Sequence, residues 1–172
     1  MTKPNLNNIN GNFIPPEVLS NNLQASEITD LNEILQSVLD KYSVEQQNNF
    51  ICRFDKLPLV YGDREHYICL FDALISMIIS HPPHNSKLFL YVRCAEAKED
   101  NEIIDLRTIA GTILCKIDIY SNITTDKNWE VVYQNKLTEC ALQATKNSGS
   151  FSFSPISNTG CLFSVTLPGK IN

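Results

Sequence analysis

The most informative stretch of the chain is Leu57-Pro58-Leu59-Val60-Tyr61-Gly62-Asp63, a short apolar run that ends in a glycine and an acid. Proline and glycine force a turn here, and Asp63 can cap a helix that begins one residue later. The helix should run from Arg64 to about Ser80, because two prolines follow it. One of its faces carries Tyr67, Phe71, Leu74, Ile75 and Ile78, and another carries Leu70, Ala73 and Met77. A helix that is apolar on several sides is expected to be buried on several sides.

The elements on either side follow from hydrophobic periodicity and capping residues. Upstream, Asp30 can cap an amphipathic helix that ends near Tyr42, with Glu33 completing a capping box. The predicted strands lie at Phe50–Phe54, Leu88–Cys94, Ile103–Leu106, Ile113–Tyr120, Phe151–Phe153 and Leu162–Leu167, and a further helix at Lys136–Lys146. This order predicts an α/β (α+β) fold, a two-layer α/β sandwich whose mixed sheet is covered on one face by helices.

Chain length and composition indicate the number of domains and the class of the protein. The chain has 172 residues, of which 43% are hydrophobic and 19% charged, as in one ordinary globular domain. Residues 1–28 are polar and rich in asparagine, which predicts a tail, and residues 29–172 form the predicted domain. The net charge of −5 is spread without a Lys/Arg cluster, which argues against nucleic acid as a partner. The chain begins without an apolar signal segment, and Ile68–Ile79 is too short to cross a bilayer, so we expect a cytoplasmic protein.

Cysteine and histidine give no strong metal or redox signal. The six cysteines lack C-x-x-C spacing and most have apolar neighbours, so we interpret them as small core residues rather than disulfides or metal ligands; they are Cys52, Cys69, Cys94, Cys115, Cys140 and Cys161. His81 and His84 have a spacing that metal ligands can have, but no carboxylate or thiolate lies beside them. A surface turn is expected there.

Three colinear segments resemble the ATPase domain of bacterial sensor histidine kinases, a member of the Bergerat-fold (GHKL) superfamily. They are Asp30–Leu35, the Leu57–Asp63 stretch with the helix segment Leu70–His81, and Gly160–Pro168, which is similar to the glycine, alternating strand and Leu-Pro that close such domains. The resemblance covers about residues 29–170. It implies a Bergerat-like fold and a place in two-component signal transduction.

In that family, asparagines on the helix after Gly-Asp hold Mg²⁺ against the ATP triphosphate through their side-chain oxygens. The two asparagine positions are occupied here by Ala73 and Met77, the polar position one turn earlier by Cys69, and the lysine position one turn later by Ser80. A methyl group and a thioether cannot replace two amides.

Four other polar side chains could in principle contribute to a nucleotide site. Asp72 and Ser76 carry oxygens, but they are about 100° round the helix from the asparagine face. Lys127 and Lys136 could meet phosphate as point charges, although we expect them to be solvated surface lysines.

The family's base-reading turn, Asp-x-Gly-x-Gly, is also replaced. Its aspartate accepts a hydrogen bond from adenine, and the corresponding residues here are Ser121, Asn122 and Ile123. Only Asn122 matches a frequent family choice, and Ile123 disfavours the positive φ that glycine would supply. The glycine-rich lid that cradles phosphates is missing too, because residues 123–136 contain no glycine. We therefore expect the former nucleotide cleft to be smaller and less polar.

These replacements lead to two interpretations of function. The kinase reaction also needs a phosphoacceptor histidine upstream, and the first histidine of the chain is His66. We expect no catalytic residue, no metal and no nucleotide cofactor, and interpret the chain as a pseudo-ATPase that binds a signalling protein such as a sensor kinase or response regulator. A homodimer is compatible with this role. The alternative is an ATP- and Mg²⁺-binding kinase domain that phosphorylates a histidine on a separate chain.

Overall fold

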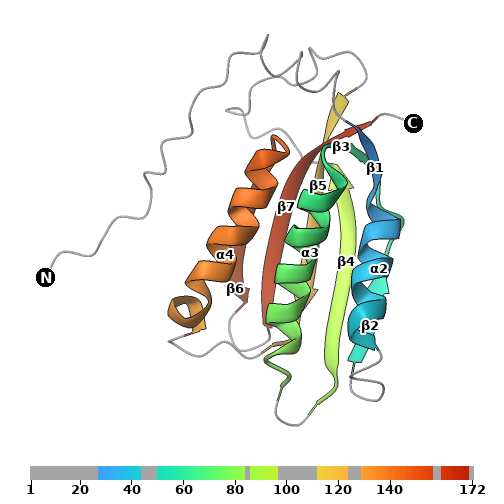
Figure 1. The fold of residues 1–172 in the computed structure, drawn as a ribbon. Helices are drawn as coiled ribbons and strands as arrows, with labels where there is room; N and C mark the ends of the chain where they lie inside the picture. Colours follow the sequence, from blue (N-terminus) through green and yellow to red (C-terminus); the bar gives the residue numbers. More distant parts are fainter. Residues whose placement is uncertain are drawn as a thin grey trace, which may run out of the picture.

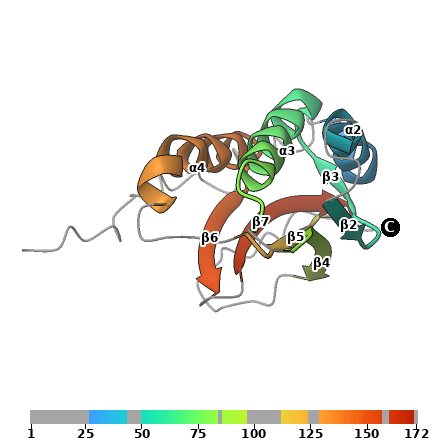
Figure 2. The same cartoon turned by 90° about the horizontal axis from the view of Figure 1, so that it is seen from below.

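The computed structural model of the chain describes residues 27–43, 50–83, 86–96, 112–123, 129–156 and 160–170. These residues form one mixed sheet with three helices packed on one of its faces (Figures 1 and 2). The helices are α2 (Leu31–Ser43), α3 (Arg64–Ile79) and α4 (Trp129–Lys146). The strands are β1 (Ile28–Asp30), β2 (Phe50–Phe54), β3 (Leu59–Tyr61), β4 (Leu88–Glu96), β5 (Thr112–Ser121), β6 (Ser150–Ile156) and β7 (Gly160–Lys170). The predicted two-layer sandwich is confirmed.

The sheet has the strand order β1-β3-β7-β5-β4-β2, and β6 pairs with β7 as well. β2 runs parallel to β4, whereas the other described pairings are antiparallel. The central pair, β5 and β7, is in register from Thr112 opposite Lys170 to Ser121 opposite Cys161. Ser121 also lies opposite Leu90 near the start of β4. The end of β5 and the starts of β4 and β7 therefore share one end of the sheet, called here the Ser121 end.

Helix α3 lies between α2 and α4 in the helix layer (Figure 1). Its predicted cap is confirmed, because the Asp63 carboxylate accepts a hydrogen bond of 2.8 Å from the backbone N–H of Glu65. Its buried residues are Tyr67, Leu70, Phe71, Ala73, Leu74, Ile75, Met77, Ile78 and Ile79. The helix is thus buried on several sides, as its sequence predicts.

The other two helices agree with their predicted starting residues to different extents. The Asp30 carboxylate caps α2 by accepting from the backbone N–H of Asn32 at 2.8 Å. Glu33, predicted to complete a capping box, lies 3.6 Å from the guanidinium of Arg64 and so links α2 to α3. Helix α4 begins at Trp129 rather than at Lys136. The predicted strand at 103–106 and the tail up to residue 26 lie outside the described residues.

None of the six cysteines, all of which lie in the described residues, forms a disulfide. Cys115, Cys140 and Cys161 are buried, and Cys52 and Cys94 are partly buried, in line with their interpretation as core residues. Cys69 is exposed, so its assignment to the core was wrong: it points away from the sheet on the outer side of α3. In the described parts of the chain, no three His, Cys, Asp or Glu side chains gather as a metal site requires. None of the described helices is long and apolar enough to span a membrane.

Candidate functional site

The residues singled out in the sequence lie along α3 and at the Ser121 end of the sheet. Helix α4 runs antiparallel beside α3, and three contacts fix the alignment of the two helices. The Cys140 thiol lies 3.9 Å from the carbonyl oxygen of Leu70, Lys136 contacts Ser76, and Tyr133 contacts His81 beyond the end of α3. The start of α4 therefore lies near the Ser121 end, beside the C-terminal half of α3 (Figure 1).

The two residues that the resemblance assigned to the asparagine positions, Ala73 and Met77, are buried on the α4 side of α3. Met77 is 0% exposed and Ala73 is 8% exposed. At about 100° per residue, both lie between the outward-facing Ser76 and the sheet-facing Leu74, on the side that α4 covers. The neighbouring positions Cys69 and Ser80 are exposed. A side chain that holds a metal and a triphosphate must be reachable from solvent before they bind, and Met77 is not.

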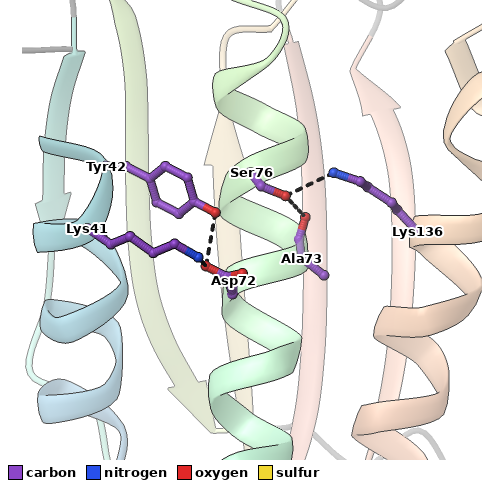
Figure 3. A network of polar contacts seen from close by, with 6 residues as sticks. All are labelled: Lys41, Tyr42, Asp72, Ala73, Ser76 and Lys136. Carbon is purple, nitrogen blue, oxygen red and sulfur yellow. Dashed lines mark hydrogen bonds and ion pairs between the residues drawn. The ribbon is translucent and has the colours of Figure 1, made fainter. Parts of the chain in front are cut away.

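Asp72 points away from this side and toward α2 (Figure 3). Its carboxylate accepts hydrogen bonds from the ammonium of Lys41 at 2.8 Å and from the hydroxyl of Tyr42 at 2.9 Å. The hydrogen bond to Asp72 raises the pKa of Lys41, and burial together with the same carboxylate raises the pKa of Tyr42. Asp72 therefore links α3 to α2, and the carboxylate oxygen that accepts both hydrogen bonds points toward α2.

Ser76 is used in the same way toward α4 (Figure 3). Its hydroxyl donates to the carbonyl oxygen of Ala73 at 3.0 Å and accepts from the ammonium of Lys136 at 3.0 Å. Lys136 is half-buried, so the expectation of a solvated surface lysine was wrong for this residue. Its long side chain reaches across the groove between two helices, a contact that requires the tertiary structure. Lys127 lies outside the described residues.

The residues that replace the base-reading turn are built into the core. Ser121 is 0% exposed and Ile123 is 1% exposed. The Asn122 side chain accepts from the backbone N–H of Phe89 at 2.7 Å and donates to the carbonyl oxygen of Lys87 at 3.0 Å. Asn122, the one residue of this turn that matches the family, thus fastens the end of β5 to the start of β4.

Gly160, the first residue of β7, packs closely against the Ser121 end of β5. Its φ is +141°, and a Cβ atom at this position would lie 2.1 Å from the carbonyl oxygen of Ser121. Any other residue would force the two backbones apart. The glycine that opens the closing strand is therefore required by close packing of β7 against the end of β5.

An aromatic cluster fills the space beside this end, and sequence reasoning missed it. Trp129, the first residue of α4, is 3% exposed; it stacks on Phe153 at 5.0 Å between ring centroids and lies 6.3 Å from Phe163. Tyr133 meets the edge of His81 at 4.7 Å and hydrogen-bonds to its ring. His81 lies in the turn that follows α3, as predicted, but its ring is half-buried against the cluster. His84 lies outside the described residues. Helical spacing of Trp129, Tyr133 and Leu137 was the available signal.

Two buried polar groups at this end have no hydrogen-bond partner among the described residues, the hydroxyl of Ser121 and the indole N–H of Trp129. Each is a single neutral group. By contrast, Mg²⁺ requires several oxygen ligands, and phosphates are held by charged side chains or arrays of backbone N–H groups. The arrangement therefore suits apolar packing with isolated polar contacts.

Solved structures of sensor histidine kinases share this architecture. The mycobacterial sensor histidine kinase MprB matches 86% of this chain and 100% of its own, with a TM-score of 0.65 and 13% identity. The ATP binding domain of PrrB from Mycobacterium tuberculosis matches 86% of this chain and 99% of its own, with a TM-score of 0.57 and 16% identity. The catalytic domain of histidine kinase ThkA matches 83% of this chain and 96% of its own, with a TM-score of 0.59 and 12% identity. Neither a protein-family model nor a curated protein matches the sequence. The chain has the fold of histidine kinase ATP-binding domains, as the resemblance implied.

Proposed function

We propose that this chain is a non-catalytic, histidine-kinase-like ATPase domain that acts as a protein-interaction module in bacterial signal transduction. The observation that carries the proposal is the burial of Met77 and Ile123, at 0% and 1% exposed, where the kinase domain presents a metal-holding amide and a glycine. A bound nucleotide would have to displace core side chains. The fold of a histidine kinase ATP-binding domain supports a signalling context, in which the partner is a sensor kinase or a response regulator.

Three separate groups normally hold ATP in this fold, and each is replaced. Ala73 and Met77 replace the metal-holding amides, and Ser121 replaces the adenine-reading carboxylate. Residues 123–136 contain no glycine to cradle phosphates. Each missing hydrogen bond to a charged group removes roughly 1.5–3 kcal/mol of binding free energy. Several such losses together take a micromolar affinity beyond the millimolar range. The smaller, less polar cleft expected from the sequence stays a prediction.

The alternative is an ATP-binding kinase domain that phosphorylates a histidine on a separate chain. One observation favours it: the Ser121 hydroxyl is buried without a hydrogen-bond partner in the described residues. It lies at the position from which the family reads adenine. A nucleotide bound there in an unorthodox way would satisfy this group.

Thermal melting with ATP and Mg²⁺ separates the two functions. Millimolar ATP at micromolar affinity stabilises a folded protein by roughly 4 kcal/mol, which raises Tm by about 10 °C for a chain of this size. We expect no change beyond that caused by Mg²⁺ alone. The ATP binding domain of PrrB, treated in parallel, serves as the positive control. A rise that needs both ATP and Mg²⁺ would overturn the proposal and establish the kinase alternative.

The partner is tested by phosphotransfer profiling with purified sensor kinases and response regulators of the source bacterium. Adding the chain should change the rate of autophosphorylation or phosphotransfer at least about twofold for one cognate pair. The chain itself should acquire no phosphate. Unchanged rates across the complete set would contradict a role in two-component signalling, whatever the outcome of the melting experiment.

A further inference from the structure

Helix α4 carries large hydrophobic side chains that are exposed to solvent. Among the described residues, the three most exposed large hydrophobic side chains are Val131 at 73%, Val132 at 67% and Leu142 at 54%, and all three lie on α4. This helix forms one edge of the helix layer, with its outer side turned away from both α3 and the sheet (Figures 1 and 2). Two of the three, Val131 and Leu142, lie on this outer side, and exposed apolar groups on one accessible face point to an interaction surface.

Five residues on this face form a continuous stripe along the helix. Val131, Asn135, Thr138, Leu142 and Thr145, called here the α4 stripe, are all exposed and uncharged. They follow one another at intervals of four, three, four and three residues, which is the spacing of the seam of a two-stranded coiled coil.

The two threonines present methyl groups to a partner, because their hydroxyl groups already have acceptors on the same helix. The Thr138 hydroxyl donates to the carbonyl oxygen of Gln134 at 2.8 Å, and the Thr145 hydroxyl donates to that of Ala141 at 2.8 Å. Contact through the stripe therefore leaves neither donor unsatisfied. Asn135 is then the one stripe residue with polar groups that need a partner.

We propose that the α4 stripe is the interface of a weak, parallel homodimer, in which two copies of α4 pack about a twofold axis. Asn135 favours a second copy of the chain as the partner. Its side-chain amide has an N–H donor and a C=O acceptor, and the Asn135 amide of the second copy offers an acceptor and a donor in return. The parallel arrangement also places Leu142 against Leu142. At the flank it brings the Gln134 amide of one copy to the Glu139 carboxylate of the other, a complementary pair.

An antiparallel pair using the whole stripe fits less well. It brings Asn135 opposite Leu142, so that each amide faces a hydrocarbon side chain and loses its hydrogen bonds to water. The parallel orientation is therefore the one that satisfies the polar groups of the stripe.

One pair of helices of this length covers less than the roughly 800 Å² per partner of a standard stable interface. The dimer should therefore form at a Kd of about 100 μM. Sedimentation equilibrium from about 20 μM to about 1 mM should show the mass rising from the monomer value of 19.4 kDa toward twice that value.

Two adjacent valines give a matched pair of variants. Val131→Glu should weaken association more than tenfold, as should Leu142→Glu, because each places two like charges face to face across the axis. Val132→Glu has the same chemistry at nearly the same exposure, but Val132 lies about 100° from Val131 round the helix, at the flank of the stripe and one heptad before Glu139. Carboxylates at this flank do not face each other across the axis, so the effect should stay below about threefold. All three side chains are solvated in the monomer, so circular dichroism should show unchanged folding.

Orientation is tested by oxidative cross-linking in a Cys69→Ser background, which removes the exposed native thiol. Leu142→Cys should form a disulfide-linked dimer in the parallel arrangement, whereas an antiparallel pair separates the two positions by about 12 Å, too far for a disulfide. A chain that stays monomeric at the highest concentration would overturn the proposal. So would equal effects of Val131→Glu and Val132→Glu, or an associating protein that does not cross-link at position 142.

Discussion

The residues that the resemblance assigned to a nucleotide site differ most in how far solvent reaches them. Cys69 and Ser80 are exposed, whereas Met77, Ser121 and Ile123 are at most 1% exposed. An exposed residue can be exchanged at little cost in folding free energy. A buried residue has become part of the packed core, where side-chain volume and polarity are constrained. Met77 and Ile123 therefore contribute to the stability of the domain, and replacing either one alone by the kinase residue should lower the unfolding free energy.

Met77→Asn tests this at the position where the kinase domain carries a metal-holding amide. We expect the variant to lose roughly 2–5 kcal/mol of unfolding free energy, because a buried thioether is replaced by a smaller amide whose hydrogen-bonding groups lack partners. Urea unfolding gives the free energy, and melting with ATP and Mg²⁺ should still show no shift. Cys69→Asn, on the exposed side of the same helix, should stay within about 0.5 kcal/mol of the wild type. An unchanged stability for Met77→Asn would mean that solvent reaches position 77.

Among the elements, α3 connects the layers of the fold. Its inner side packs on the sheet, Asp72 holds α2, and Ser76 receives Lys136 from α4. The helix is capped by Asp63, whose own backbone N–H donates to the Asn147 side chain just beyond α4 at 3.0 Å. An element that contacts both other helices and the sheet should dominate the stability of the domain.

Leu74→Ala removes a fully buried side chain from the sheet-facing side of α3. We expect a loss of roughly 2–5 kcal/mol of unfolding free energy, since the cavity it leaves cannot collapse between packed layers. Leu142→Ala, which truncates the same side chain at 54% exposure, is the control. At low micromolar concentration, where the chain is monomeric, it should cost less than about 0.5 kcal/mol. Similar losses for the two variants in urea unfolding would contradict the placement of α3.

At the scale of the whole molecule, the buried thiols connect folding to alkaline pH. Burial raises the pKa of Cys140 and of Cys161 to about 12, from an ordinary value of 9.0. Cys140 lies between α4 and α3, and Cys161 lies on β7 beside the end of β5. Deprotonating either thiol in the folded state would place a charge in the core shared by both layers.

We therefore expect the unfolding free energy to fall as pH rises above 9. Between pH 9 and about 12 the unfolded chain has lost these protons while the folded chain keeps them, so the folded state binds more protons and a rise in pH favours unfolding. Each thiol contributes a slope of up to roughly 1.4 kcal/mol per pH unit. Urea unfolding from about pH 8 to 11 should show a shallower decline for Cys161→Ala than for the wild type. Parallel curves would show that Cys161 titrates normally in the folded protein.

Local signals in the sequence were sufficient to predict several helices and strands. The caps at Asp30 and Asp63 start helices where predicted, and the apolar positions of α3 and those of Leu162–Leu167 in β7 mark residues that became buried. Together with the three colinear segments, these signals were sufficient for the two-layer sandwich. They succeed because capping and periodicity depend on residues within one or two turns of each other.

The contacts of several polar side chains at the candidate site depend on elements far away in the chain. The sequence predicted Lys136 in solvent and Cys69 in the core, whereas Lys136 reaches Ser76 and Cys69 is exposed. It gave no sign that Asn122 binds the start of β4. Each outcome depends on the element packed beside the residue, and α4 itself begins at Trp129, whose aromatic partners lie on β6 and β7. The sequence pattern of one segment predicts which face of a helix or strand is apolar. It does not predict which other helix or strand packs against that face, because that contact joins residues far apart in the chain.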